Sequence, residues 1–428
     1  MKVLMFGWEF PPHISGGLGT ACYGLTKGLA KHGVEILFVM PSPYGDEDQS
    51  AVKIINASDV VINESVKNSE SFLQKVQFLR VGSNMVPYVD PVRFTTLVES
   101  QRVSQIEGYK MYAGERYQFS GKYETNLMEE VARYAIVAGE IALKYDFDLI
   151  HAHDWLTYLA GITAKRLTGK PLVVHMHATE FDRSGNNINT QVYDLEKMGM
   201  KEADIVIAVS NLTRSIVISK YGINPEKVVT VHNAVEFDKS GNVEVDRGVP
   251  EKVVTFLGRI TYQKGPEYFI EAAAKVLKRY PNVRFVMAGN GDLLTRAIRR
   301  VAKLGIATKF HFTGFLKGSD VNRMYAYSDV YVMPSVSEPF GISPLEAMRA
   351  NVPVIISKQS GVAEVLTHAL KVDFWDIDAM ADAIHALLIY PALSNFVVKN
   401  GFEEVNALKW DNAAAKVKEI YTKLTGKL

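Results

Sequence analysis

The stretch Lys252–Leu257 reads KVVTFL, and it is followed by a helical-period segment at 266–280 and a second apolar run at Val283–Ala288. Short runs rich in Val and Ile that alternate with helical segments are typical of β-α-β units, whose strands are parallel. The alternation continues, with strands expected at 309–312, 330–333 and 352–356 and helices at 292–303, 319–327 and 344–350. It predicts a doubly wound, Rossmann-like α/β domain over residues 241–409.

The first half of the chain repeats this organisation. Strands are expected at 2–7, 34–40, 149–152, 171–175, 204–209 and 228–231. Helices are expected at 18–32, where Gly33 supplies the usual C-terminal glycine, and at 125–145. A polar, glycine-containing stretch at 236–251 suits a linker. We therefore expect a second Rossmann-like domain over residues 1–240, with the two domains facing a cleft at the carboxyl ends of their strands.

Two further segments stand apart from this alternation. The segment 410–424 is amphipathic, because Ala413, Val417, Ile420, Tyr421 and Leu424 share one helical face. The region 67–126 is the least regular part of the chain and is rich in aromatic residues. This region either adds a second layer to the core or contacts a ligand through its aromatic rings.

Composition and charge limit the classes of partner. The chain has 428 residues, which favours two domains, and its net charge of +1 does not indicate a nucleic-acid partner. Cys22 is the only cysteine, so the sequence predicts neither a disulfide framework nor a cysteine-rich metal site. No apolar run approaches the roughly 20 residues that span a bilayer. We expect a cytoplasmic protein without a transmembrane segment.

Glycines and cations follow the first strand of each domain. Gly16-Gly17 precedes a helix start, where backbone N–H groups can bind a phosphate, although a turn that needs positive φ explains the pair equally well. Arg259 and Lys264 lie between a strand and a helix that begins near Pro266. Cations beside the positive end of a helix dipole are unfavourable unless an anion lies between them, such as a diphosphate leaving group. The alternative is a solvated basic loop.

The stretch 337–346 reads SEPFGISPLE and carries a carboxylate near each end. Glu346 has a structural explanation, because Ser343-Pro344-Leu345-Glu346 has the form of a capping box, with Ser343 as N-cap and Glu346 at N3. Glu338 precedes a proline in a loop at a strand end, where no capping role accounts for it. We expect Glu338 to bind a ligand.

Histidines follow two strands of the first domain. The motif His151-Ala152-His153-Asp154-Trp155 ends a strand, and His175 and His177 end the next one. Two histidines could bind a metal, but the sequence around them shows no obvious third ligand. A polar contact between His153 and a substrate is the stronger expectation, with a histidine satisfied in the domain wall as the alternative.

Two other charged motifs have structural explanations. Asp146-Phe147-Asp148 has the form of a metal-binding Asp-x-Asp motif, but turn residues at a strand start account for it. A basic helical stripe is formed by Arg296, Arg299, Arg300 and Lys303. A solvated helix face explains the stripe, and peripheral contact with a membrane is the alternative.

The ordered set of motifs resembles the retaining glycosyltransferases of family 4, which have the GT-B fold. Four motifs occur in the same order over nearly the whole chain: Gly16-Gly17, the segment 153–155, Arg259 with Lys264, and Glu338 with Glu346. Within that family the glycogen and starch synthase branch is most similar, through the segment 151–155, the stretch GRITYQKG at 258–265 and the Glu338 loop.

The resemblance implies a role for each candidate residue. Arg259 and Lys264 would hold the donor diphosphate, while Glu338 and His153 would lie at the transferred sugar, and these four form the expected catalytic set. The remaining residues expected to bind the donor are Gly16, Gly17, Asn233, Phe340, Gly341, Ile342 and Glu346. Among them, Glu346 would bind the ribose hydroxyls. The family also implies that the helix at 410–428 packs back on the first domain, and that the chemistry needs no metal or cofactor.

One departure from the family pattern affects the donor. Glycogen synthases of the bacterial type carry a lysine two residues before the double glycine, and Ile14 occupies that position here. We expect an ADP- or UDP-sugar donor, glucose as the sugar and the end of an α-glucan as the acceptor. The alternatives are a transferase of the same fold with a small sugar, lipid or cell-wall acceptor, and a non-catalytic nucleotide-sugar-binding protein.

The residue types also suggest a mechanism. A retaining glycosidase places two carboxyl groups about 5 Å apart and uses one as the nucleophile. Glu346 is expected at the ribose, so no second carboxylate is evident on the opposite face of the sugar. We therefore expect the acceptor hydroxyl to attack on the same face from which the phosphate departs, with that phosphate acting as the base.

Overall fold

The computed structural model describes residues 1–13, 17–62, 116–121, 127–235, 248 and 250–427. Most of the linker expected at 236–251 and most of the aromatic-rich region at 67–126 lie outside these residues. The chain divides into two compact units. Unit 1 comprises Met1–Phe181, Asn186–Ala234 and Trp410–Leu428, and unit 2 comprises Asp182–Gly185 and Val235–Lys409.

Unit 1 contains a seven-stranded parallel sheet with the order β3-β2-β1-β4-β5-β6-β7. Its strands are β1 (Lys2–Phe6), β2 (Glu35–Met40), β3 (Lys53–Asn56), β4 (Leu149–His153), β5 (Leu172–Met176), β6 (Ile205–Ala208) and β7 (Val228–Thr230). The strands are apolar on both faces because helices cover the sheet on both sides, as parallel sheets require. The strand order reverses between β1 and β4.

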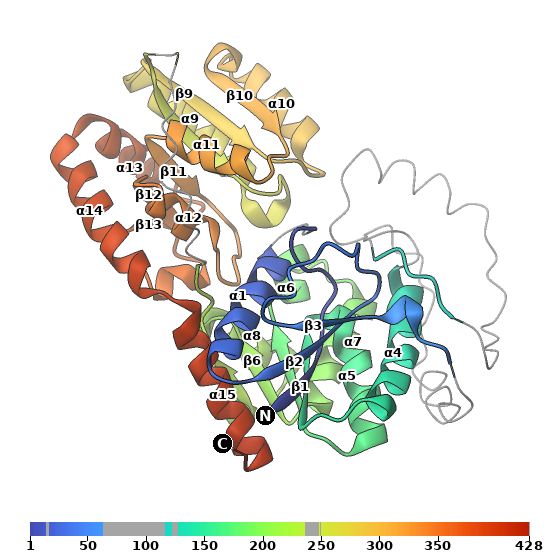
Figure 1. Ribbon diagram of the computed structural model, residues 1–428. Coiled ribbons are helices and arrows are strands. Elements are labelled where there is room, and N and C mark those ends of the chain that lie inside the picture. The colour runs from blue at the N-terminus through green and yellow to red at the C-terminus, as the bar shows by residue number, and fades with distance from the viewer. Residues whose placement is uncertain (14–16, 63–115, 122–126, 236–247, 249, 428) are drawn as a thin grey trace, which may run out of the picture. The chain divides into compact units, whose positions relative to one another are not determined.

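The helices of unit 1 form two layers, one on each face of its sheet. They are α1 (Gly17–Lys31), α4 (Leu127–Lys144), α5 (Trp155–Thr168), α7 (Thr190–Glu202), α8 (Asn211–Tyr221) and α15 (Trp410–Thr425). The short helix α6 (Glu180–Ser184) begins in unit 1, but its residues from Asp182 onward belong to unit 2. Side chains of α4, α5, α7 and α8 fill the core on one face, and those of α1 and α15 fill it on the other. The C-terminal helix α15 therefore lies beside the first helix of the chain (Figure 1).

Unit 2 contains a six-stranded parallel sheet with the order β10-β9-β8-β11-β12-β13. Its strands are β8 (Lys252–Leu257), β9 (Val283–Ala288), β10 (Phe310–Gly314), β11 (Val330–Met333), β12 (Val354–Ser357) and β13 (Leu370–Val372). Its helices are α9 (Pro266–Arg279), α10 (Leu294–Lys303), α11 (Ser319–Tyr327), α12 (Ser343–Arg349), α13 (Ile377–Ile389) and α14 (Pro391–Ala407). The strand order reverses between β8 and β11. These two sheets confirm the prediction of two doubly wound α/β units.

Local sequence sets several helix ends. The side chain of Ser210 accepts a hydrogen bond from the Thr213 N–H and caps α8, which ends at Gly222 in the left-handed conformation. The capping box expected at Ser343 is wrong. Helix α12 has Ile342 at its N-cap and no capping hydrogen bond from a side chain. The Ser343 side chain instead hydrogen-bonds to the Tyr331 side chain, because the helix begins one residue earlier than predicted.

Candidate functional site

Arg259 follows β8 in a loop that lies against a second loop at close range. The Ile260 N–H donates to Asn290 O at 2.8 Å, and a Cβ at Gly289 would lie 1.8 Å from Gly258 O. A Cβ at Gly291 would lie 2.3 Å from Ile260 O. Only glycine permits such an approach of two backbones. The Gly289 and Gly291 pair after β9 therefore fixes the path of the chain that carries Arg259.

Lys264 lies in a short 3₁₀ turn that leads into α9. Gly265 joins the two with φ of +64°, and a Cβ there would lie 2.2 Å from Pro334 O. The first turn of α9 has no side-chain cap. Lys264 is thus held next to a helix N-terminus whose N–H groups no side chain caps, an arrangement that favours an anion.

Glu338 lies in the loop after β11 and pairs with Lys264. The ammonium of Lys264 donates to Glu338 Oε2, and the Ser335 hydroxyl donates to the same oxygen at 3.2 Å. The side chain of Glu338 is 8% exposed and that of Lys264 is 19% exposed. The structure therefore brings together the cation expected at the phosphate and the carboxylate expected at the sugar.

The loop between Glu338 and α12 contains the other residues predicted from this stretch. Gly341 has φ of +100°, and a Cβ there would lie 3.1 Å from Glu338 Cγ, so a larger residue would disturb the carboxylate. Phe340 is buried, and its carbonyl accepts from the Val362 N–H at 2.7 Å. Ile342 is half-buried and its carbonyl accepts hydrogen bonds from α12.

Glu346 is half-buried on α12, where its Oε2 accepts a hydrogen bond from the Tyr325 hydroxyl at 3.1 Å. Burial raises the pKa of Glu346 above its ordinary 4.5, although the bond from Tyr325 opposes the shift. Burial also raises the pKa of Tyr331, and the nearby carboxylates of Glu338 and Glu346 add to that shift. Both ends of the predicted loop therefore lie near one tyrosine of β11.

Four imidazoles gather at the carboxyl ends of β4 and β5 in unit 1. His153 pairs in register with His175, and His151 and His177 lie two residues away on the same face of their strands. His153 Nδ1 lies 3.0 Å from His177 Nε2, whereas His153 Nε2 has no hydrogen-bond partner among the residues that the structure describes. Burial lowers the pKa of His153 well below its ordinary value, and His151 and His177 lower it further. His153 is therefore neutral at neutral pH, with one ring nitrogen left for a ligand.

The residue after His153 has an unusual backbone. Asp154 has φ of 63° and ψ of 166°, a region that residues other than glycine rarely occupy. Its side chain accepts from the Trp155 N–H at 3.0 Å and its own N–H donates to His175 O at 2.9 Å. These bonds hold the strained residue in place, and strain of this kind is commonly stored at functional sites.

The other donor-binding residues predicted in unit 1 are in different surroundings. Gly17 is exposed at the first position of α1, and in the described part of the chain a Cβ there would meet only its own helix and its chain neighbours within 4 Å. Gly16 lies outside the described residues. Asn233 is 8% exposed and follows β7. Gly17 and His153 come after β1 and at the end of β4, the two strands between which the order of this sheet reverses.

Several residues that shape the site were not predicted from the sequence. Ser335 is fully buried beside Glu338, but a serine after an apolar strand carries no signal of its own. Gly289 and Gly291 form a visible Gly-x-Gly pattern after a strand, which could have indicated close backbone approach. Asp154 was part of the histidine motif, but its strained backbone comes from tertiary hydrogen bonds that the sequence does not reveal.

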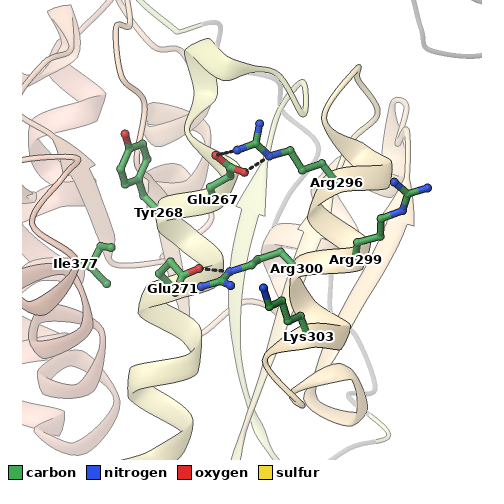
Figure 2. Close-up of a pocket in the computed structure, with 8 residues that line it drawn as sticks. All are labelled: Glu267, Tyr268, Glu271, Arg296, Arg299, Arg300, Lys303 and Ile377. Carbon is green, nitrogen blue, oxygen red and sulfur yellow. Dashed lines mark hydrogen bonds and ion pairs between the residues drawn. The ribbon is translucent and has the colours of Figure 1, made fainter.

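The Asp-x-Asp motif and the basic stripe, for which the sequence offers structural explanations, both form ion pairs with residues of the chain itself. Asp148 accepts from the Lys2 N–H at 2.8 Å and pairs with Lys427, and among the described residues Asp148 belongs to no cluster of potential metal ligands. Figure 2 shows that two arginines of the basic stripe point from α10 toward α9, where Arg296 pairs with Glu267 and Arg300 with Glu271. Half of the stripe is therefore neutralised within unit 2.

No single helix in the described part of the chain is long and apolar enough to cross a membrane. Ile377–Ile389 and Pro391–Thr425 meet the criterion only when taken together, and they are bent by 97°.

Comparison with known proteins identifies two family models that together cover most of the chain. Residues 2–231 match the starch synthase catalytic domain, and residues 243–404 match the glycosyl transferases group 1 model. An uncharacterized glycosyltransferase of Methanocaldococcus jannaschii is 29% identical, with 98% of each chain covered. A glycogen synthase of Mycobacterium tuberculosis is 22% identical over 98% of this chain and 94% of its own.

Solved structures show the same fold over the whole length. The sucrose-phosphate synthase of Thermosynechococcus elongatus has a TM-score of 0.71 at 19% identity, with all of both chains covered. Anabaena HepE, solved with UDP and glucose, has a TM-score of 0.66 at 18% identity, covering 99% of this chain and 100% of its own. Since the starch synthase catalytic domain model matches residues 2–231, which are more than half of the chain, and the solved GT-B structures share its fold, the chain belongs to the glycogen and starch synthase-like GT-B glycosyltransferases.

Proposed function

We propose that this glycosyltransferase moves glucose from an ADP- or UDP-sugar to a hydroxyl at the end of an α-glucan, with retention of the anomeric configuration. The observation that carries the proposal is the Lys264–Glu338 pair, with Arg259 on the same side of the sheet. All three residues follow β8 or β11, the strands between which the order of the second sheet reverses. Ligands of doubly wound sheets bind at such a reversal, beyond the carboxyl ends of the strands.

The basic residues suit a diphosphate. Lys264 has three N–H donors, so its pairing with Glu338 leaves donors for phosphate oxygens. The N-terminus of α9 adds its dipole and backbone N–H groups without a competing side-chain cap. Arg259 provides a second, permanent positive charge. In the proposed reaction this set stabilises the negative charge that develops on the leaving nucleoside diphosphate.

Glu338 suits the transferred sugar. Its carboxylate is fixed by Lys264 and Ser335, and the glycine at 341 leaves space beside it. In the proposal Glu338 accepts hydrogen bonds from sugar hydroxyls, and Glu346 does the same for the ribose. The acceptor hydroxyl attacks on the face from which the phosphate leaves, and a departing phosphate oxygen takes its proton.

The first unit contributes a neutral histidine to the proposed reaction. His153 Nε2 is the ring nitrogen without a protein partner, and it is assigned to a hydroxyl of the transferred sugar. The Gly17 N–H and the Asn233 amide are assigned to the donor phosphates and to the sugar pocket. No metal enters the proposed chemistry.

The choice of glucose and glucan draws on the relatives. The glycogen synthase of M. tuberculosis aligns over nearly the whole chain, and HepE was solved with UDP-glucose. The isoleucine at 14, where bacterial-type glycogen synthases carry lysine, keeps a different donor and a small sugar, lipid or cell-wall acceptor as the second candidate. A sucrose-phosphate synthase among the structural neighbours favours that alternative over a non-catalytic binding protein.

The donor and the acceptor can be tested together. Purified protein is incubated with ADP-glucose, UDP-glucose or GDP-mannose, each with glycogen, with a small sugar phosphate, or without acceptor. The proposal expects elongation of glycogen by glucose and, by NMR, a new α-linkage. Transfer to the small acceptor alone would establish the second candidate, and a β-linkage would refute retention. Donor binding without transfer or hydrolysis would indicate a binding protein.

The role of the basic pair has its own test. Lys264→Ala should cost about 2–4 kcal/mol of transition-state stabilisation, which is a loss of roughly 30- to 1,000-fold in kcat/KM. Lys275→Ala is the matched control, since Lys275 lies on α9 and pairs with Asp378 at the surface. Thermal unfolding of both variants separates a loss of activity from a loss of fold. Near-normal turnover in a folded Lys264→Ala protein would refute the assignment.

A further inference from the structure

The four imidazoles at the ends of β4 and β5 form two stacked pairs that meet at their edges. His151 and His153 of β4 stack with ring centroids 4.2 Å apart, and His175 of β5 stacks with His177 at 4.4 Å. The centroids of His153 and His177 are 5.3 Å apart and the ring planes are tilted by 34°, yet His153 Nδ1 lies only 3.0 Å from His177 Nε2. These two rings therefore share a hydrogen bond between their edges.

The stack and the hydrogen bond restrict His153 in different ways. Packing against His151 fixes the plane of the His153 ring, but it does not decide which nitrogen carries the proton or which edge of the ring faces His177. A hydrogen bond decides both, because it needs a nitrogen at one place and a proton on one of the two partners. Among the described residues His177 is the only hydrogen-bond partner of the His153 ring, so His177 selects its orientation and its tautomer.

Each of the two rings carries one proton at neutral pH. Burial lowers the pKa of His177 to about 3, and the pKa of His153 also lies well below its ordinary value. A neutral imidazole has one N–H group and one unprotonated nitrogen. One of the two N–H groups lies in the shared bond. The other must lie on an outer nitrogen, which is either His153 Nε2 or His177 Nδ1.

The two outer nitrogens differ in what can accept a hydrogen bond from them. His177 Nδ1 is buried, and no group of the described residues bonds to it, so a proton there would have no acceptor with or without substrate. His153 Nε2 also has no partner in that part of the chain, but it is the atom assigned to a hydroxyl of the transferred sugar, whose oxygen can accept. Because buried N–H groups are rarely left without an acceptor, a proton on His153 Nε2 is favoured.

We propose that His177 is a positioning residue for the transfer reaction. Its Nε2–H donates to His153 Nδ1 and so holds His153 with the proton on Nε2, from which His153 donates to an oxygen of the transferred sugar. In this arrangement His177 acts through His153 and does not itself contact the substrate. The tautomer stands on contacts within unit 1, whereas the donation to the sugar rests on the proposed function.

The tautomer is tested by NMR of the full-length protein labelled with nitrogen-15 in its histidines. Long-range proton–nitrogen spectra distinguish a protonated ring nitrogen from an unprotonated one, and the signals of His153 are identified by their loss in His153→Gln. We expect His153 to be protonated on Nε2 alone, and to become a mixture of tautomers in His177→Leu. A proton on His153 Nδ1 in the unmodified protein would overturn the proposal, whether or not His177→Leu folds. A single, unchanged tautomer in folded His177→Leu would overturn it too.

Kinetics tests whether the bond acts on transfer, with whichever donor the enzyme uses. His177→Leu should lower kcat/KM about tenfold, the factor expected for one hydrogen bond. His177→Gln should recover most of that loss, because its amide N–H can donate in place of the imidazole. The double variant His153→Ala/His177→Leu should be no slower than His153→Ala, since the bond then has no ring to hold. His311→Ala, which alters an exposed histidine of β10, is the control and should keep the parent activity.

The double variant separates positioning from support of the fold. If the losses of the two single variants multiply in the double variant, His177 acts independently of His153 and the proposal is overturned. Full transfer activity in folded His177→Leu, with folding checked by thermal unfolding, would have the same meaning. A parent protein without transferase activity would refute the proposed function, and the NMR spectra would still decide the tautomer.

Discussion

At the scale of single residues, the burial of Glu346 affects both the stability of the protein and the ribose-binding role proposed for this side chain. The carboxylate is half-buried and accepts a hydrogen bond from the Tyr325 hydroxyl, and burial raises its pKa. The folded protein therefore prefers the protonated form more than the unfolded chain does. Stability from this group is complete below about pH 4.5, the unfolded value, and it is lost as the pH rises through the folded pKa.

Glu346→Gln should remove that loss. Thermal unfolding of the ligand-free proteins should show no difference near pH 4 and a more stable variant at pH 7, because glutamine does not ionise. Nucleotide affinity should fall by about 1 kcal/mol, since hydrogen bonds to a charged acceptor are about twice as strong as neutral ones. A variant that is less stable than the parent at pH 7 would contradict the assignment of Glu346 as a ligand-binding rather than a structural carboxylate.

The sequence predicted some site residues better than others, for physical reasons. Lys264 and Glu338 were singled out because a cation before a helix and a carboxylate before a proline have no local explanation, and the structure places them in contact. The capping interpretation of Glu346 was wrong because Tyr325, which is distant in the sequence, supplies its partner. The contact between the rings of His153 and His175 could not be predicted, since the register of two strands decides it.

At the scale of elements, the contact between α1 and α15 depends on two glycines of α1. A Cβ at Gly24 would lie 2.1 Å from Trp410 Nε1, and one at Gly28 would lie 2.7 Å from Ala414 Cβ and 2.8 Å from Trp410 O. Small residues four positions apart share one helix face, so the two helices approach closely along it. The Lys31–Asp411 ion pair adds a contact at the edge of this face.

Gly28→Ala should therefore destabilise the protein although alanine is the better helix former. The intrinsic gain is roughly 1 kcal/mol. Overpacking against a backbone carbonyl costs about 1–3 kcal/mol, so we expect a net loss in urea unfolding. Gly17→Ala on the same helix is the matched control, because its methyl group meets open space. A stability gain in Gly28→Ala would show that α15 does not pack as described.

Elements with a strong contrast in hydropathy were predicted with accurate bounds. The strands Lys252–Leu257, Val283–Ala288 and Val330–Met333 and the helix Ser319–Tyr327 have the expected ends. Helix α5 was missed because ten consecutive residues, Trp155–Ala164, are buried and give no polar face to reveal its period. Strand β13 was missed because three residues at a sheet edge are too short to give a pattern.

At the scale of the whole molecule, each unit has its own sheet and core, yet the chain returns to unit 1 after it has formed unit 2. Helix α15 brings the last residues of the chain into the first core, where Trp410, Val417, Ile420 and Tyr421 are at most 8% exposed. Each such side chain contributes about 1.5–3 kcal/mol. Their sum is comparable with the whole stability of a typical domain, about 5–15 kcal/mol.

Removal of residues 410–428 should therefore unfold unit 1 and leave unit 2 folded. Limited proteolysis should then yield a resistant fragment that begins near residue 250, and calorimetry should retain one transition. Removal of residues 422–428 alone is the control, because it keeps all four buried side chains and should change stability little. Two unchanged transitions after the longer deletion would contradict the placement of α15.

The burial of Cys22 makes its thiol a probe of how often this part of unit 1 opens. The chain has one cysteine, and its thiol lies 1% exposed between α1 and the first sheet, beside the histidines. A thiol reagent can modify it only while that helix layer is open, so the labelling rate measures how often the histidine face opens. The full-length protein should react slowly, and removal of residues 410–428 should make the reaction as fast as that of an unfolded chain.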